Sequence, residues 1–152
     1  MLALSVKGLS TMNTDIRNLL PHREPFLFVD RLLSRDDASG VGEYTFTLEK
    51  NSFFKGHFPG NPIVPGVILV ESMAQVCVAS IIAGGKYGDR VPVFFLAGVE
   101  GVRFMRPVRP GDTLVTHALN GKTRGRFHAF EVEGFVNGEK AVKASLKCFV
   151  EA

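Results

Sequence analysis

The sequence predicts an α+β fold in which a curved antiparallel sheet wraps around one long central helix. Two observations lead to this expectation: the apolar segment 66–83 has helical length, and most of the chain that follows has strand composition. A chain of 152 residues fits one domain. We therefore expect a single domain over residues 1–152, in which residues 1–12 form a flexible N-terminal extension.

The central helix is expected over residues 66–83. Pro65 precedes this segment and Gly84-Gly85 follows it, as is usual at helix starts and ends. The segment is apolar on nearly every face, and a helix of that kind is buried all round. The sheet must then curl around the helix to cover it. Because Glu71, Ser72 and Gln75 interrupt the apolar run, we expect a core helix rather than a membrane span.

Segments of strand composition lie on both sides of this helix: 26–33, 38–48, 91–99, 101–108, 112–121, 127–136 and 140–150. Asn120-Gly121 and Asn137-Gly138 predict tight hairpin turns. A short capped helix is expected after Asn13-Thr14-Asp15, ended by Pro21. Six or seven strands, mostly in hairpin order around one buried helix, indicate an architecture of the hot-dog type.

Composition narrows the cellular setting. The two cysteines, Cys77 and Cys148, are too few for a disulfide framework and lack the close spacing of a metal site. They favour a reducing compartment. We find no signal peptide and no membrane span, so we expect a cytoplasmic protein that binds no membrane.

The net charge is +3, and basic residues concentrate between Arg103 and Arg126. Such a surface attracts an acidic partner, although it is also compatible with a solvated strand face. No nucleic-acid-binding motif is present, so we expect no nucleic-acid partner.

One segment combines residues suited to acid–base chemistry. His57 lies in a loop rich in glycine and proline, and an imidazole is well matched to act as a base. Glu71 lies inside the apolar helix, where burial raises the pKa of a carboxyl and lets it act as an acid. The backbone N–H groups of Gly66 and Val67 open the helix and suit a carbonyl that gains negative charge. Gln75, four residues after Glu71, lies on the same helix face and is placed to orient it.

The segments LPHREPFLFVDR (20–31) and FKGHFPGNPIVPGVILVESMAQ (54–75) resemble the signature segments of the 3-hydroxyacyl-acyl-carrier-protein dehydratases of type II fatty-acid synthesis, the FabZ family. The similarity covers residues 14–150. It implies a hot-dog fold and conversion of (3R)-3-hydroxyacyl-acyl carrier protein to the trans-2-enoyl thioester. His57 and Glu71 match the catalytic pair of that family, which needs no metal and no organic cofactor.

The resemblance also implies homodimers with shared active sites, His57 coming from one subunit and Glu71 from the other, and assembly as a hexamer, a trimer of dimers. The acidic acyl carrier protein would be the partner, and Arg103, Arg106 and Arg109 are candidates for docking it. Within the matching motif we expect a set of substrate-binding residues: Phe58, Pro65, Gly66, Val67 and Gln75. Four phenylalanines either line the acyl tunnel or fill the core: Phe53, Phe94, Phe95 and Phe104.

Other interpretations remain open at this point. A hot-dog acyl thioesterase, a hydratase acting on coenzyme A esters, a non-catalytic acyl-binding module or a paralogue of a specialised pathway would share the fold. The related dehydratase/isomerase family (FabA type) carries Asp in place of Glu71, which favours dehydration without isomerisation. Of the other histidines, His22 is expected to have a structural or entrance role, and His117 and His128 are not expected to be catalytic.

Overall fold

The computed structural model describes residues 10, 11 and 14–151. Its elements follow in the order β1 (Ser10–Thr11), the 3₁₀ helix η1 (Ile16–Asn18), β2 (Arg31–Arg35), β3 (Ser39–Thr45), the 3₁₀ helix η2 (Ser52–Lys55), α1 (Gly66–Ala83), β4 (Val93–Phe104), β5 (Thr113–Arg124), β6 (Phe127–Val136) and β7 (Glu139–Glu151). The strands form one seven-stranded sheet in the order β1-β2-β3-β5-β6-β7-β4. Every neighbouring pair is antiparallel.

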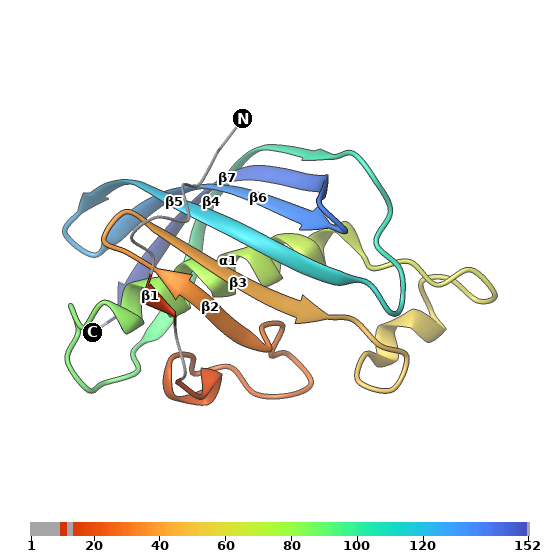
Figure 1. Ribbon diagram of the computed structural model, residues 1–152, viewed down its shortest axis with the longest axis horizontal. Helices are drawn as coiled ribbons and strands as arrows, with labels where there is room; N and C mark the ends of the chain where they lie inside the picture. The colour runs from red at the N-terminus through yellow and green to blue at the C-terminus, as the bar shows by residue number, and fades with distance from the viewer. Residues whose placement is uncertain (1–9, 12–13, 152) are drawn as a thin grey trace.

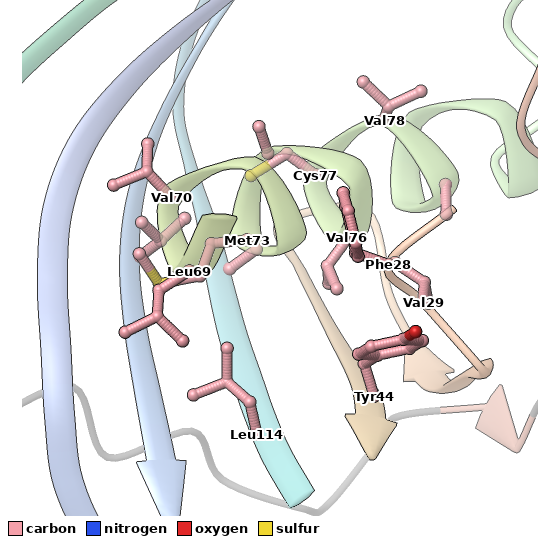
Figure 2. Close-up of a cluster of buried hydrophobic side chains, with 14 of the residues drawn as sticks. Phe28, Val29, Tyr44, Leu69, Val70, Met73, Val76, Cys77, Val78 and Leu114 are labelled. Atoms are coloured by element: carbon pink, nitrogen blue, oxygen red, sulfur yellow. The ribbon is translucent and has the colours of Figure 1, made fainter. Parts of the chain in front are cut away.

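The sheet curves over α1, as Figure 1 shows, and the expected α+β hot-dog architecture is confirmed. Side chains from the helix and from the sheet form the core between them. Met73 and Val76 of the helix lie in this core with Tyr44 of β3 and Leu114 of β5 (Figure 2). This packing fixes the helix, and with it Glu71, relative to the sheet.

The bounds of α1 agree with the expected range of 66–83, but its first turn is not covered by the sheet. Val67 is 76% exposed, and the buried positions begin at Leu69. The expectation that the helix is buried all round is therefore wrong for this turn. By length and composition α1 could cross a membrane, yet 67% of it is buried inside the protein, as in the core helix of a soluble protein.

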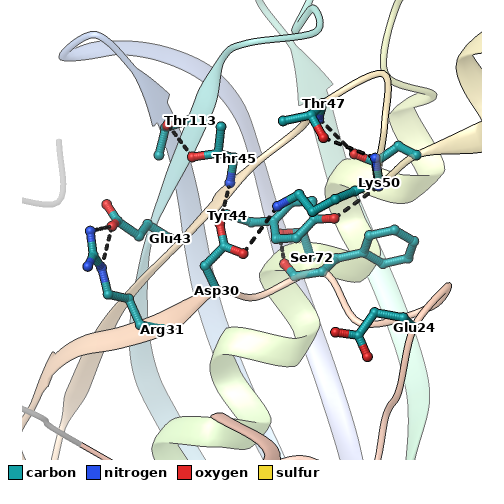
Figure 3. Close-up of polar contacts among 12 residues, drawn as sticks. Glu24, Asp30, Arg31, Glu43, Tyr44, Thr45, Thr47, Lys50, Ser72 and Thr113 are labelled. Atoms are coloured by element: carbon teal, nitrogen blue, oxygen red, sulfur yellow. Dashed lines mark hydrogen bonds and ion pairs between the residues drawn. The ribbon is translucent and has the colours of Figure 1, made fainter. Parts of the chain in front are cut away.

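Residues 26–30, expected to begin a strand, do not belong to the sheet, and β2 starts only at Arg31. At Phe28, hydrogen bonds to the helix take the place of strand pairing. The Phe28 N–H donates to Gln75 Oε1 at 2.7 Å. Ser72 Oγ donates to the Phe28 carbonyl oxygen at 2.8 Å, and Figure 3 shows the Ser72 side chain. A segment that satisfies its backbone on helix side chains has no need of a neighbouring strand.

Two expected strands, 91–99 and 101–108, are the single strand β4. Its pairing with β7 continues through two bulges, between Leu96 and Gly98 and between Glu100 and Arg103. Gly101, with φ +59°, lets the chain bulge without leaving the sheet. The glycine marks a bulge rather than a turn.

The predicted turn at Asn120-Gly121 is also wrong, because β5 continues through a bulge to Arg124 and the chain reverses at Gly125. The turn at Asn137-Gly138 is confirmed. Both residues have positive φ, +51° and +76°, as a tight hairpin turn requires.

Part of the N-terminal segment pairs with the sheet. Ser10 and Thr11, expected to belong to a loose extension, form β1 against β2. Residues 1–9 and 12, which complete the expected extension, lie outside the described residues, as does Asn13 of the expected cap. The short helix is η1, and the Asp15 side chain caps it by accepting from the Arg17 N–H at 2.9 Å.

Gly42 of β3 lies directly against the helix, and we expect Gly42→Ala to destabilise the protein. A Cβ at this position would lie 2.8 Å from Val76 Cγ2, so the helix or the strand would have to move. Overpacking of this kind costs about 1–3 kcal/mol, which urea unfolding measures. Gly121→Ala is the control, since its Cβ would meet only the Ala129 carbonyl oxygen, at 3.7 Å. Equal stabilities of the two variants would contradict this packing argument.

Candidate active site

The loop that carries His57 is anchored at its start by Asn51. This side chain is 3% exposed; its Nδ2 donates to the Tyr44 hydroxyl at 2.9 Å, and its Oδ1 accepts from the Thr47 N–H at 2.9 Å (Figure 3). The 3₁₀ helix η2 then leads directly to His57, whose N–H donates to the Phe53 carbonyl oxygen at 3.1 Å. The loop therefore leaves β3 along a fixed path.

His57 is held at both backbone and ring. Its carbonyl oxygen accepts from the Ile63 N–H at 2.9 Å, and its Nδ1 lies 2.9 Å from the Ile63 carbonyl oxygen. The neutral ring then carries its proton on Nδ1 and leaves the lone pair on Nε2 free to accept a proton. Phe58 stacks on the imidazole with centroids 4.0 Å apart, across a cis His57–Phe58 peptide. The side chain is half-buried, oriented and equipped as a base.

An open pocket of about 410 Å³ joins His57 to the start of α1. It is lined by His57, Ile63, Val64, Gly66, Leu69, Phe104, Met105, Arg106, Pro107 and Val108. A Cβ on Gly66 would lie 2.7 Å from the Phe104 ring, so glycine lets this aromatic side chain cover the helix start. The first N–H groups of an α-helix have no partner within the helix. In this protein the helix start, at Gly66, lines the same pocket as the imidazole of His57.

Glu71 lies in a second, narrower hollow, of about 80 Å³. Its Oε1 accepts from Gln75 Nε2 at 2.9 Å and lies 3.5 Å from His22 Nε2. The hollow is lined by His22, Glu71, Ala74, Gln75, Val78, Phe94, Phe95, Leu96 and Cys148. Burial raises the pKa of Glu71, while the Gln75 hydrogen bond acts in the opposite direction. A carboxyl in this setting retains its proton at higher pH than an exposed one and can serve as an acid.

Within one chain His57 and Glu71 line separate pockets. Gly66 lines the same pocket as His57, and Gln75 lines the same hollow as Glu71. Phe58 contacts the imidazole directly.

Pro65 and Val67 line neither of the two pockets. Pro65 is the helix N-cap residue, and its carbonyl oxygen accepts from Ile68 at 2.9 Å. The Val67 side chain is exposed, so only its backbone N–H remains a candidate for substrate contact. The sequence did not reveal that His22 contacts Glu71; its place in the first signature segment was the only signal.

Of the four phenylalanines considered for an acyl tunnel, Phe104 lines the His57 pocket, whereas Phe94 and Phe95 line the Glu71 hollow. Phe53 packs against the core instead, with its ring 4.7 Å from that of Phe54. Cys77 and Cys148 are both buried free thiols. Within residues 10–11 and 14–151, no group of three His, Cys, Asp or Glu side chains is placed to hold a metal ion.

Comparison with known proteins assigns the family. A FabA-like domain matches residues 20–145. A protein from Thermomicrobium roseum named 3-hydroxyacyl-acyl-carrier-protein dehydratase FabZ is 41% identical over 86% of this chain and 87% of its own length. This chain belongs to the FabZ dehydratase family. The protein of the same name from Syntrophotalea carbinolica is 45% identical over 88% of this chain and 90% of its own length.

Solved structures support the hot-dog fold of this FabZ family member. The dehydratase heterocomplex ApeI:P from Xenorhabdus doucetiae contains a chain that superposes with a TM-score of 0.80 at 18% identity, over 93% of both chains. A hypothetical thioesterase with coenzyme A from Streptococcus pneumoniae superposes with a TM-score of 0.61 at 14% identity, over 80% of this chain and 85% of its own. At these identities the likeness concerns the fold alone.

Proposed function

We propose that this protein removes water from (3R)-3-hydroxyacyl-acyl carrier protein to give the trans-2-enoyl thioester in fatty-acid biosynthesis. The observation that supports this most strongly is the contrast between its two titratable groups. His57 has an oriented ring with a free Nε2, and Glu71 is a buried carboxyl whose pKa is raised. A base and an acid of this kind are what elimination beside a carbonyl requires.

In the proposed reaction, His57 Nε2 removes a proton from C2 of the substrate. The thioester oxygen gains negative charge and is held by the N–H groups of Gly66 and Val67. The C2–C3 double bond then forms as the C3–O bond breaks, and Glu71 gives its proton to the departing hydroxyl, which leaves as water. Solvent returns the proton from His57 to Glu71. Each acid–base group contributes about 10²–10⁴-fold, and an oxyanion donor about 10²–10³-fold.

These steps use a base, an acid and N–H donors, so we propose no resident metal or organic cofactor. The acyl chain would arrive on the phosphopantetheine arm of acyl carrier protein. We propose that the enzyme works as a soluble protein in the cytoplasm. The Glu at position 71, in place of the Asp of the dehydratase/isomerase type, favours dehydration without double-bond migration.

We propose that the complete site forms between two chains. β4 is the last strand of the sheet, and on its core-facing side it exposes a row of apolar side chains that includes Leu96, Val99 and Phe104, whose partners on β7 are buried. An exposed apolar edge strand invites pairing with another chain. One end of this strand borders the Glu71 hollow, and its other end borders the His57 pocket.

Antiparallel pairing of two β4 strands about a two-fold axis near Val99 would place residues 94–96 of one chain beside residues 102–104 of the other. Each Glu71 hollow would then meet the His57 pocket of the partner. The symmetric dimer would contain two such sites, because a two-fold interface uses the same surface twice. Further assembly into a trimer of dimers stays a prediction, which the mass of the complex in solution will test.

We propose that acyl carrier protein docks at the basic rim of the His57 pocket. Arg106 lines this pocket and pairs with Glu139. Arg109, three residues further along the chain, is exposed and donates to Asn61 Oδ1 at 3.0 Å. Asn61 lies in the same loop as His57, so an acidic partner bound there would be close to the site.

Arg109→Glu is therefore expected to raise the KM for a carrier-protein substrate about fivefold and leave kcat unchanged. The KM for the same acyl group on coenzyme A should change much less, because that substrate lacks the acidic protein. Arg124→Glu makes the same charge change at the far end of β5 and is the control. Equal KM values for both variants in steady-state assays would exclude this docking surface.

The function itself is tested by incubating the protein with 3-hydroxyacyl-acyl carrier proteins of several chain lengths. Enoyl-thioester absorbance and mass spectrometry should show loss of one water and no free thiol. Release of free thiol would instead indicate a thioesterase. A folded protein that binds acyl carrier protein but converts none of the substrates would indicate a non-catalytic binding module.

A further inference from the structure

His22 faces the proposed catalytic acid from outside the helix. Its Nε2 lies 3.5 Å from Glu71 Oε1, the same oxygen that accepts from Gln75 Nε2 at 2.9 Å. Both side chains are about one-fifth exposed, His22 at 20% and Glu71 at 21%. The contact joins the segment before β2 to Glu71, the proposed catalytic acid. The mechanism proposed above does not use this contact.

The backbone around His22 is tightly held. The Arg23 guanidinium donates to the Leu20 carbonyl oxygen at 2.9 Å and to the His22 carbonyl oxygen at 2.6 Å. Leu20 is fully buried, and the Phe26 N–H donates to the Arg23 carbonyl oxygen at 2.8 Å. The imidazole is thus presented to Glu71 from a fixed segment.

The surroundings of the ring decide which nitrogen carries the proton. His22 Nδ1 is buried and has no hydrogen-bond partner among the described residues. A proton on Nδ1 would be an unsatisfied buried donor, which is costly. Nε2 is instead the ring nitrogen that lies 3.5 Å from an acceptor, Glu71 Oε1, so the neutral ring favours the tautomer with its proton on Nε2.

We propose that His22 is a positioning residue for the proposed dehydration: its neutral ring and the Gln75 amide both direct an N–H at Oε1 of Glu71. With Oε1 accepting both N–H groups, the acid proton would lie on Oε2. When this proton passes to the departing hydroxyl, the two N–H groups stabilise the carboxylate that remains. Hydrogen bonds of this kind are often long before substrate binds and shorten during the reaction. This role rests on the dehydratase function proposed above.

The groups around the pair support a neutral imidazole. Burial, and then the neighbouring Arg23 guanidinium, lower the pKa of His22. From β7, the Cys148 thiol faces the same hollow, and burial followed by the charge of Glu71 raises its pKa to about 12. β4 contributes only Phe94, Phe95 and Leu96. An imidazolium at 3.5 Å would hold Glu71 as a carboxylate and remove the acid, whereas a neutral ring leaves its proton in place.

The test compares His22→Leu with His22→Gln, which have similar volumes but differ in the N–H group. The leucine variant should lose about tenfold in kcat, with KM within about twofold, because one donor to a charged group is lost. Activity requires a protonated Glu71 and falls as pH rises through its pKa. Loss of the donor raises that pKa, so the alkaline limb of the kcat–pH profile should move to higher pH. The glutamine variant should retain most of the wild-type kcat, and the alkaline limb of its kcat–pH profile should lie at the wild-type pH.

A titration of Glu71 followed by carboxyl ¹³C NMR gives the same comparison without turnover, and it should show a higher pKa in the leucine variant. His117→Leu, at a half-buried histidine that packs on Phe135, is the control and should change neither kcat nor the limb. Equal kcat and an unmoved limb in His22→Leu, or equal losses in the leucine and glutamine variants, would overturn the positioning role. A wild-type protein without dehydratase activity would instead overturn the proposed function.

Discussion

Replacement of Glu71 by glutamine should lower kcat for dehydration by about a hundredfold or more. Glutamine has nearly the same shape, and its side-chain oxygen can still accept the Gln75 N–H, but it has no proton to give to the departing hydroxyl. KM should change little, because the substrate contacts remain. Enoyl-thioester absorbance with a saturating hydroxyacyl-acyl carrier protein measures the loss.

The same variant should not be less stable than the wild type at neutral pH. Burial raises the pKa of Glu71, so the folded protein keeps this proton over a pH range in which the unfolded chain has lost it. The contribution of Glu71 to stability is therefore full at low pH and is lost as pH rises through that range. Glutamine does not titrate, and urea unfolding at several pH values should show the difference. A folded and fully active variant would contradict the acid role, and a variant that is less stable than the wild type at neutral pH would contradict the expected effect on stability.

His57→Asn should lower kcat by about 10²–10⁴-fold. In the wild type, the Ile63 carbonyl oxygen accepts from His57 Nδ1. The asparagine amide can still donate to this oxygen. The loop should therefore keep its shape, while the lone pair that accepts the C2 proton is lost. Exchange of the C2 proton with deuterated solvent, followed by mass spectrometry, isolates this step from the loss of water.

His117→Asn makes the same change on β5, outside both pockets, and should retain the wild-type rate. If His57→Asn still exchanged the C2 proton at the wild-type rate, another group would have to be the base. The two catalytic variants together separate the proton removed at C2 from the proton donated at C3.

The apolar pattern of the sequence and its prolines and glycines were sufficient to predict the helix and most of the strands. Pro65 and Gly84 set the helix bounds because they act on the local backbone. The errors arose where the outcome depends on distant contacts. Gln75 and Ser72 hold Phe28 away from the sheet, and composition alone cannot reveal that competition. Asn120-Gly121 is a strong local turn signal, but continuous pairing with β6 overrides it.

In the candidate site, too, local features could be predicted from the sequence, whereas contacts between distant segments could not. The pairing of Gln75 with Glu71 follows from helical spacing. The contact between His22 and Glu71 joins segments 49 residues apart and depends on the fold, so spacing could not reveal it. The separation of His57 from Glu71 within one chain is likewise a property of the folded molecule. It is the reason for the proposal that a second chain completes the site.

Mixing the two inactive variants tests most directly whether His57 of one chain works with Glu71 of another. Subunits of His57→Asn and Glu71→Gln would be exchanged and the dehydratase rate measured against each variant alone. A mixed dimer contains one site with both native residues and one with neither, so random exchange should restore about one quarter of the wild-type rate. Mixed dimers, verified by native mass spectrometry, that remain as inactive as the separate variants would show that each chain builds its own site.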